Sequence, residues 1–393
     1  MIIRSKEERE AELQGFKFFE LIVPLIRKLH GFGAERDKSK NREFFYDDYV
    51  SLLLLYFFNP VLDSLDALQK ATELEKVQKY LGISRVSKGT LSEAGSIFDP
   101  THLEAIIREL AKQAVPLTKG RDAEILRGLT AVDGSIFTLI CKAFWALWQD
   151  KKHRGVKLHL HFSVFESVPL QATVTPAASS ETAQLKATLT AGLLYVVDRG
   201  YQDYSLYRAI LDAKSSFIGR VKNNIAYEVL EERQLTIEAV KAGVIRDVIL
   251  KRLGTSHHKD EIKQPVRLVV ISSTDDNGKP IELWLITDKL DMPAEYIGLA
   301  YHYRWTIELF FRWFKQILGC RHIISTKEKG VTMQLYVGLI ASLLIVLHTG
   351  LKPNKRTWEM IQFYLMGWAT LEELERHITK QLERQERAKN KNN

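Results

Sequence analysis

The sequence predicts a mixed α/β protein, with a helical N-terminal domain, a sheet that contains strand–helix alternation, a β-rich insertion and helices at the C-terminal end. Three observations support this fold class. Residues 8 to about 115 show helical periodicity, alternating strands begin near residue 126, and helical patterns return after residue 288. The 393 residues are 46% hydrophobic, which is enough for two or three domains with a large core.

The helical N-terminal part is interrupted by Pro60 and Pro100 and contains the apolar run "YVSLLLLYFF" at residues 49–58. A second apolar run, "YVGLIASLLIVL", covers residues 336–347. Both runs are shorter than the roughly 20 residues that span a bilayer, so they predict buried helices. The charged opening "MIIRSKEEREAELQGF" lacks the apolar core of a signal peptide. We therefore expect a cytoplasmic protein with no membrane partner.

The end of this helical part has the spacing of a helix-turn-helix. It predicts a helix, a turn through Gly82, and a second helix that is capped at Ser84 or Ser87. Arg85 and Lys88 lie at the start of the second helix, where they are candidate contacts to DNA phosphates. Helical hairpins without a DNA-binding role have the same spacing, so a purely structural role is an equal alternative.

Strand patterns dominate the middle of the chain. The predicted elements are strands at residues 126–140 and 155–177, a helix at 179–192, a buried strand at 193–200 and a helix at 201–214. Strands prevail again from residue 216 to residue 288, with Asn277-Gly278 as a hairpin turn. The sheet is therefore expected to be mixed, with a β-rich segment in its second half.

The charge balance favours a polyanionic partner. Lys and Arg number 56 against 48 Asp and Glu, a net charge of +8, which favours nucleic acid without demonstrating it. The tail "RHITKQLERQERAKNKNN" has six basic and two acidic residues, and it is either a solvated helix or an arm that touches phosphates. Cys141 and Cys320 lack the C-x-x-C spacing, so they indicate neither a disulfide framework nor a zinc site.

The segment "YHYRWTIELFFRWFK", residues 301–315, concentrates charge and aromatic residues. On an α-helix at about 100° per residue, four polar residues fall within about 60° of one another. These residues are Tyr301, Arg304, Glu308 and Lys315. The opposite side forms a predicted core face of Leu309, Phe310, Trp313, Phe314 and Ile317. A solvated face with an Arg304/Glu308 pair is the alternative to a functional one.

Two aspartates on predicted strands complete a candidate site. Asp133 lies within a strand, and Asp198 ends a buried strand, where open α/β sheets usually build their sites. A strand-end aspartate is often only a turn or cap residue. Together with Glu308, however, the two aspartates form a carboxylate set that suits Mg²⁺ and can hold two such ions for displacement at phosphorus. Arg304 and Lys315 are then expected to clamp phosphate.

The spacing Tyr301-x2-Arg304-x3-Glu308-x6-Lys315 resembles the Tyr-Arg-Glu-Lys signature of the insertion-sequence-four family of bacterial transposases. The resemblance extends to "VVDRGYQDYSLY" and "FIGRVKNNIAYEV", more loosely to "SKGTLSEA", and covers roughly residues 80 to 350. It implies a ribonuclease-H-like core with a catalytic triad of Asp133, Asp198 and Glu308. The long interval between the last two is similar to the family's β-rich insertion.

The resemblance implies a cut-and-paste transposase that cleaves at its element's ends with Mg²⁺, or Mn²⁺ in its place, and joins the 3′ ends to target DNA. The implied partners are double-stranded DNA, as terminal inverted repeats and as target, and a second copy of the chain in the DNA complex. A repressor derived from such an enzyme and a nuclease that only hydrolyses remain alternatives. The predicted domains are helical 1–118, core 119–220, insertion 221–290, core completion 291–350 and basic tail 351–393.

Several aromatic residues and histidines have less certain roles. The resemblance implies a tryptophan that receives a flipped base, and Trp284 is the nearest candidate, although its register from Thr287 puts it on the opposite strand face. Trp305 is expected to pack in the core or beside DNA. His153, His159 and His161 lack a third zinc ligand at a suitable spacing, so structural or DNA-near roles are favoured. Lys157, on the same strand, resembles a family position near the active site.

Overall fold

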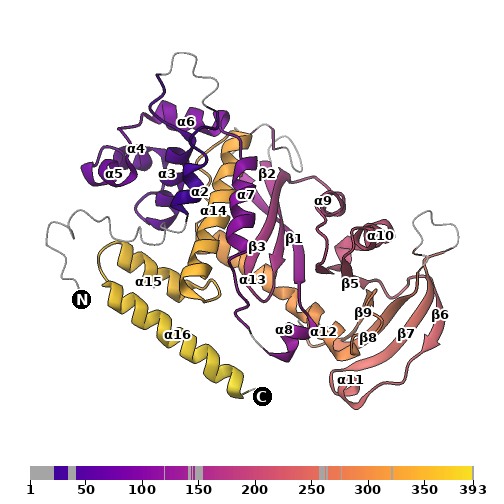
Figure 1. Cartoon of the computed structure of the whole chain (residues 1–393). Helices are drawn as coiled ribbons and strands as arrows, with labels where there is room; N and C mark the ends of the chain where they lie inside the picture. The colour runs from indigo at the N-terminus through magenta and orange to yellow at the C-terminus, as the bar shows by residue number, and fades with distance from the viewer. Residues whose placement is uncertain are drawn as a thin grey trace.

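A computed structural model describes residues 22–33, 41–118, 120–139, 143, 145–146, 154–255, 262, 264–275, 277–319 and 322–391 (Figure 1). Helices form both ends of this structure and a single sheet runs through its middle. The predicted mixed α/β class is confirmed. Cys141, Cys320 and His153 lie outside the described residues.

The N-terminal part is helical throughout its described length, as predicted. Its helices are α2 (Val23–Arg27), α3 (Tyr46–Phe58), α4 (Leu65–Ala71), α5 (Glu75–Leu81), α6 (Lys88–Ile97), α7 (Thr101–Ala111) and α8 (Arg121–Ile125). The apolar run in α3 is buried, also as predicted, because α3 packs against α14 (Glu328–Thr349).

The helix-turn-helix segment differs from the prediction in one respect. Its first part is two short helices, α4 and α5, because the chain breaks its helical hydrogen bonding between residues 72 and 74. Gly82 ends α5 in the left-handed region, at φ 68°, which glycine adopts at little cost. Ser87, and not Ser84, caps α6 by accepting a hydrogen bond from the Thr90 amide.

In the described part of the chain, nine strands form one sheet in the order β3-β2-β1-β4-β5-β9-β8-β7-β6. The first five strands are β1 (Leu129–Leu139), β2 (Arg154–Ser163), β3 (Val168–Pro176), β4 (Leu194–Val197) and β5 (Ser216–Val221). Strands β1, β2 and β3 are antiparallel, whereas β1, β4 and β5 are parallel. This arrangement is the ribonuclease-H-like core that the resemblance implied. Between its strands lie α9 (Glu181–Ala187), the 3₁₀ turn η3 (Arg199–Tyr201) and α10 (Tyr204–Asp212).

The β-rich insertion extends the core sheet instead of forming a separate one. It consists of β6 (Tyr227–Glu232), α11 (Ile237–Lys241), β7 (Val244–Leu253), β8 (Val266–Thr274) and β9 (Pro280–Thr287). Strand β9 pairs with β5, so the insertion continues the sheet to the side away from α7 (Figure 1). The predicted turn joins β8 to β9, with Gly278 at φ 77°. The numbered domain boundaries remain a prediction.

Among the described residues, five helices follow the insertion: α12 (Ala294–Tyr303), α13 (Trp305–Gln316), α14, α15 (Lys355–Leu365) and α16 (Leu371–Lys391). Helix α14 is long and apolar enough to cross a membrane, but 89% of its most apolar window is buried inside the protein. It contacts α3, α6, α7 and β3, so it is the buried helix that the sequence predicted.

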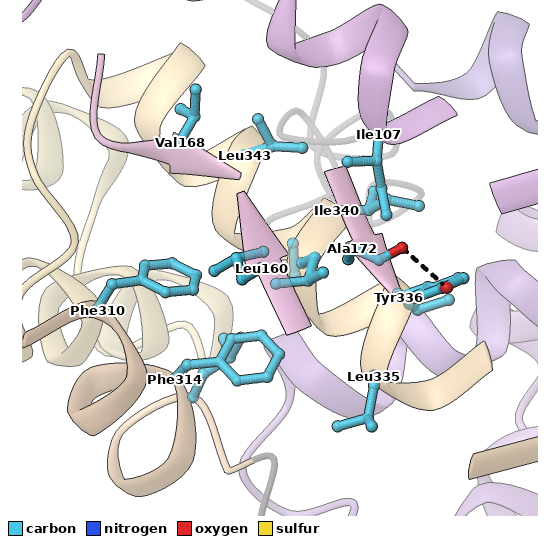
Figure 2. Close-up of a cluster of buried hydrophobic side chains, with 14 of the residues drawn as sticks. Ile107, Leu160, Val168, Ala172, Phe310, Phe314, Leu335, Tyr336, Ile340 and Leu343 are labelled. Carbon is cyan, nitrogen blue, oxygen red and sulfur yellow. Dashed lines mark hydrogen bonds between the residues drawn. The ribbon is translucent and has the colours of Figure 1, made fainter. Parts of the chain in front are cut away.

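The main core lies where α13 and α14 meet the sheet. Figure 2 shows Leu160 of β2 between Phe310 and Phe314 on one side and the side chains of α14 on the other. Tyr336 Oη donates a hydrogen bond to the Ala172 carbonyl over 3.1 Å, which ties α14 to β3. This packing fixes α13 against β1 and β2, and α13 bears part of the candidate site.

Candidate active site

Asp133 and Asp198 are brought to the same edge of the sheet by parallel pairing. Strands β1 and β4 are in register through Ala131 and Val196, and each aspartate lies two residues beyond its strand's member of that pair. Asp133 Oδ1 accepts the Gly134 amide at 2.8 Å, and Asp198 Oδ1 accepts the Arg199 amide at 2.6 Å. Asp198 therefore does cap a turn, as the structural alternative proposed, while its carboxylate also contacts α12.

The signature segment is two helices, so the prediction of one continuous helix is wrong. Helix α12 ends and α13 begins at Arg304, whose φ of −52° and ψ of −33° remain helical. Tyr301, Glu308 and Lys315 are all half-buried along with Arg304.

The predicted core face is largely correct. Phe310, Trp313 and Phe314 are buried and Ile317 is half-buried. Leu309, however, is 46% exposed. The prediction was wrong there because the arc that packs on the sheet also includes Ile307 and Phe311, and this shift leaves Leu309 at its margin.

The polar face of the signature segment contacts the carboxylates. Tyr301 Oη donates to Asp198 Oδ1 over 3.0 Å, and Arg304 Nη2 lies 2.6 Å from Glu308 Oε1. The side chains of Arg304 and Glu308 are 12% and 29% exposed, so this is not the solvated surface pair of the alternative interpretation. Arg304 Nε is buried and has no hydrogen-bond partner among the described residues.

The environment of Asp133 disfavours its charged form. Burial, and to a smaller extent the neighbouring carboxylates Glu181 and Glu308, raise the pKa of its carboxyl group to about 6 against the lowering effects of the Gly134 amide and Arg304. Asp133 and Glu308 therefore lie close enough to interact electrostatically, although they are far apart in sequence. Arg304 interacts with Asp198 and Glu308 in the same way.

The sequence did not identify Glu181, which adds a fourth carboxylate at this site. Glu181 begins α9, and its Oε1 lies 2.8 Å from Lys157 Nζ. Tyr201 also forms a hydrogen bond with Glu181 and interacts with Asp133. A Cβ atom on Gly134 would approach the Lys157 side chain to 2.9 Å, so glycine makes room for this pair. The cap pattern "SSET" after β3 was the only signal that could have drawn attention to Glu181.

Two cations flank the site on different elements. Arg220 of β5, which sequence reasoning also missed, forms a side-chain hydrogen bond with Tyr301. Lys315 Nζ donates to the Ile136 carbonyl over 2.6 Å and lies 4.8 Å from the centre of the Phe137 ring. Lys315 therefore ties α13 to β1, and its expected phosphate contact remains a prediction.

The donor set matches Mg²⁺ in chemical type, because carboxylate oxygens are its usual protein ligands. Burial is the largest cause of the raised pKa of Asp133, and the smaller contribution from Glu181 and Glu308 is a repulsion of the kind that a bound cation relieves. Within the described ranges, however, no three acidic, histidine or cysteine side chains are grouped closely enough to hold a metal ion. Arg304 donates a hydrogen bond to the Glu308 carboxylate, and Tyr301 donates one to the Asp198 carboxylate. The carboxylates can hold a cation only after these contacts rearrange.

The remaining predicted residues lie elsewhere. Arg85 and Lys88, at the start of α6, are 68% and 55% exposed, and they pair with Glu73 at 3.0 Å and Asp66 at 2.7 Å. They belong to the helical N-terminal part and are not in the carboxylate cluster. Their role in DNA binding is untested.

The two tryptophans occupy different surroundings. Trp284 Nε1 donates to Glu282 over 2.9 Å, and its ring meets Tyr227 edge to face. A groove between α12 and the insertion is lined by Tyr301, Arg304 and Trp305. Leu283, which directly precedes Trp284 on β9, also lines this groove. Trp305 is 48% exposed, which excludes the core from its two expected environments and leaves packing beside DNA as a prediction.

His159 and His161 are buried structural residues. Their Nε2 atoms lie 2.8 Å from Thr175 Oγ1 and 3.1 Å from Thr188 Oγ1, respectively. Burial lowers the pKa of each histidine to about 4. Neither belongs to a metal-binding group in the described part of the chain.

Comparison with known proteins adds an independent observation. Residues 126–344 match the family described as "Transposase DDE domain". The segment includes β1, β4 and α13, the elements that carry the three predicted catalytic carboxylates.

Three curated relatives are similar to the chain. "Putative transposase y4zB" of Sinorhizobium fredii is 30% identical over 53% of this chain and 57% of its own length. "Probable transposase for insertion sequence element IS5377" of Geobacillus stearothermophilus is 27% identical over 51% of each chain. "Putative transposase for insertion sequence element IS4SA" of Synechocystis sp. is 24% identical over 71% of this chain and 77% of its own. The chain thus spans little more than half the length of the first two.

Proposed function

The chain belongs to the transposase DDE domain family, and on that premise we propose that it is a cut-and-paste DNA transposase of the insertion-sequence-four type. In this proposal it binds the terminal inverted repeats of its element, cleaves there and transfers the 3′ ends to target DNA. The observation that carries the proposal is the approach of Asp133, Asp198 and Glu308 to one basic and phenolic cluster formed by Tyr301 and Arg304.

Asp133, Asp198 and Glu308 would hold Mg²⁺, two ions in the proposal, with Mn²⁺ able to replace them. When bound, the metal activates a water or hydroxyl and stabilises the leaving oxygen of the phosphodiester. The protein's own contribution is to orient the reacting groups. Tyr301 fixes the rotamer of Asp198 through its 3.0 Å hydrogen bond, and α13 supports Glu308 on a buried aromatic base.

We propose that the Arg304 guanidinium exchanges its hydrogen-bond partner, from the Glu308 carboxylate to a phosphate of the DNA. Its Nε is a buried donor without a partner, and its Nη2 holds a carboxylate that the metal also requires. A scissile phosphate entering the site would satisfy both donors in bidentate fashion and free Glu308. Lys315 and Arg220 would add positive charge on either side.

The partners follow from the same proposal. The helical N-terminal part, with Arg85 and Lys88 at the start of α6, would bind the terminal repeat, and a homodimer would hold the two ends together. The protein would act in the cytoplasm on the nucleoid.

The test uses purified full-length protein, a duplex with one end of its element, and Mg²⁺. Wild-type protein should produce nicks and joined products on a denaturing gel. Glu308→Gln keeps the shape of the side chain but removes its charge, so cleavage should fall by several orders of magnitude while end binding survives. Cleavage by Glu308→Gln at the wild-type rate would refute the proposal, and end binding without any cleavage by wild-type protein would favour the repressor. Hydrolysis without joining would instead indicate the nuclease.

A further inference from the structure

Helix α16 carries a row of cations along one side. At about 100° per residue, Arg376, Lys380, Arg384 and Arg387 fall within about 80° of one another. All four side chains are exposed, and they line one shallow hollow with Thr379 and Glu383. The helix also carries Glu372, Glu373 and Glu375 near its beginning and Glu383 and Glu386 nearer its end. We call these four cations the α16 basic row.

The α16 basic row has little internal neutralisation. Arg387 pairs with Glu383 at 3.5 Å, and both side chains are more than half exposed. Arg376, Lys380 and Arg384 form no ion pair with the described residues. Exposed pairs contribute only about 0 to 1 kcal/mol, so the Arg387 pair could exchange its partner readily. The row therefore presents three or four charges to solvent.

The field of the row extends to the neighbouring helix. His377 lies beside it, and Arg356 of α15 approaches from the other helix. Burial lowers the pKa of His377, and the positive charges of Arg384, Arg356 and Lys380 lower it further. The cations Arg384, Lys380 and Arg356 thus gather where two helices meet, an arrangement that favours an anionic partner.

The opposite side of α16 is already used. Leu374 is fully buried and Ile378 is half-buried against the core, and α16 packs along α15 (Figure 1). A helix that binds a membrane surface needs a free apolar face, and most of the apolar face of α16 packs against the rest of the protein. A charged partner with regularly spaced anions fits the row better than a lipid surface.

We propose that the α16 basic row binds the phosphate backbone of double-stranded DNA without reading its sequence, as a contact separate from the carboxylate site. From Arg376 to Arg387 the helix rises about 16 Å. A duplex of that length carries about ten phosphate charges, since it has one per about 1.7 Å of its axis. The inference rests on the proposed function, and it assigns the partner of a surface that the reaction itself does not require.

The experiment measures binding of full-length protein to a duplex of unrelated sequence across a range of salt concentrations. In the triple variant Arg376→Gln, Lys380→Gln and Arg384→Gln, the slope of log K against log salt should become shallower by about 2.7, at 0.9 for each lost phosphate contact. Circular dichroism verifies that α16 still folds. End cleavage by the same variant, on a short duplex at low salt, should remain within about threefold of wild type.

Two control variants separate the row from total charge. Arg376→Lys, Lys380→Arg and Arg384→Lys keep the charge in place and should keep the slope. Lys214→Gln, Lys241→Gln and Lys279→Gln remove equal charge from exposed sites elsewhere and should also leave the slope nearly unchanged. An unchanged slope in the first triple variant, or an equally large decrease of the slope in the third, would overturn the inference.

Binding to vesicles that contain phosphatidylserine is measured as a further arm. If the first triple variant loses vesicle binding but keeps its DNA binding, the row binds lipid and the inference is also overturned. End cleavage is measured in a separate assay. A failure of this inference is therefore distinguished from a failure of the proposed function.

Discussion

At the scale of single residues, the carboxylate site holds its negative charges together with internal donors. Asp133 shares its surroundings with Glu181 and Glu308, whereas Arg304 and Tyr301 each bind one carboxylate. Repulsion between buried carboxylates costs free energy unless a cation or a proton reduces it. Two predictions follow from this electrostatic balance.

Asp133 should destabilise the metal-free protein at neutral pH. Its pKa in the folded protein is about 6 against an ordinary value of 3.8, so the folded state binds more protons between these values. The stability that protonated Asp133 contributes is therefore present below pH 3.8 and lost as the pH rises through about 6. Asp133→Asn cannot ionise, so with EDTA at pH 7.5 it should raise the free energy of unfolding, by up to about 3 kcal/mol.

The measurement is urea denaturation of both proteins at pH 7.5 and pH 4. The advantage of Asp133→Asn should shrink at the lower pH, where the wild-type carboxyl is protonated. If Asp133→Asn is as stable as wild type or less stable at pH 7.5, the raised pKa of Asp133 in the folded protein is contradicted.

Arg304 should compete with the metal when DNA is absent. Because its guanidinium neutralises Glu308 at 2.6 Å, we expect Arg304→Ala to bind Mn²⁺ several-fold more tightly than wild type in calorimetry without DNA. The same variant should cleave DNA more slowly, since it loses a phosphate ligand. Arg304→Lys keeps the positive charge but not the forked guanidinium. Its Mn²⁺ affinity and its cleavage rate should therefore lie between those of wild type and Arg304→Ala. Weaker Mn²⁺ binding by Arg304→Ala would show that Arg304 supports the metal site instead of competing with it.

At the scale of elements, the helical pair around Gly82 presents α6 with its first residues exposed. Ser87 caps α6, and Arg85 and Lys88 extend from its start toward solvent, held only by the exposed acids Glu73 and Asp66. Weak surface pairs of this kind leave both cations available to phosphate. The geometry thus allows the DNA-binding interpretation without requiring it.

Charge reversal at both positions, Arg85→Glu and Lys88→Glu, should weaken binding to the element's end. The salt dependence of this binding should flatten by about 1.8 in log–log slope, because two phosphate contacts are lost. Gel-shift titration at several salt concentrations measures both effects. Wild-type affinity and slope in the variant would leave α4, α5 and α6 with a structural role only.

At the scale of the whole molecule, the buried side chain of Arg267 joins the insertion to the segment just before the signature helices. Arg267 of β8 bonds Asp247 of β7 at 2.6 Å, and both side chains are at most 6% exposed. Arg267 also donates to the carbonyls of Leu290 and Met292, just before α12. The insertion is therefore mechanically connected to the helix that carries Tyr301.

Removing one partner of this pair should be costly. Arg267→Ala leaves Asp247 buried and unpaired, and we expect a loss of about 3–5 kcal/mol in the free energy of unfolding. The double variant Arg267→Ala with Asp247→Ala removes the orphaned charge and should recover part of that loss. Chemical denaturation of the single and double variants measures the coupling between them. Additive losses would mean that the pair is not coupled.

The sequence by itself determined the fold class and most of the elements, because apolar periodicity, turn glycines and buried strand runs act over short stretches of chain. It also determined which side of residues 301–315 carries charge, since a helix repeats its faces at a fixed angle. The family of the chain followed from the spacing of Tyr301, Arg304, Glu308 and Lys315.

Only the tertiary structure decided how those charges are used. The Arg304–Glu308 contact, the bond from Tyr301 to Asp198 and the arrival of Glu181 beside Asp133 depend on parallel pairing of β1 with β4 and on packing of α13 against the sheet. Leu309 was misjudged for the same reason, because burial depends on which neighbour covers a helix face. Local patterns specify which face is apolar, whereas long-range contacts specify how far its edges extend and which charges meet across the sheet.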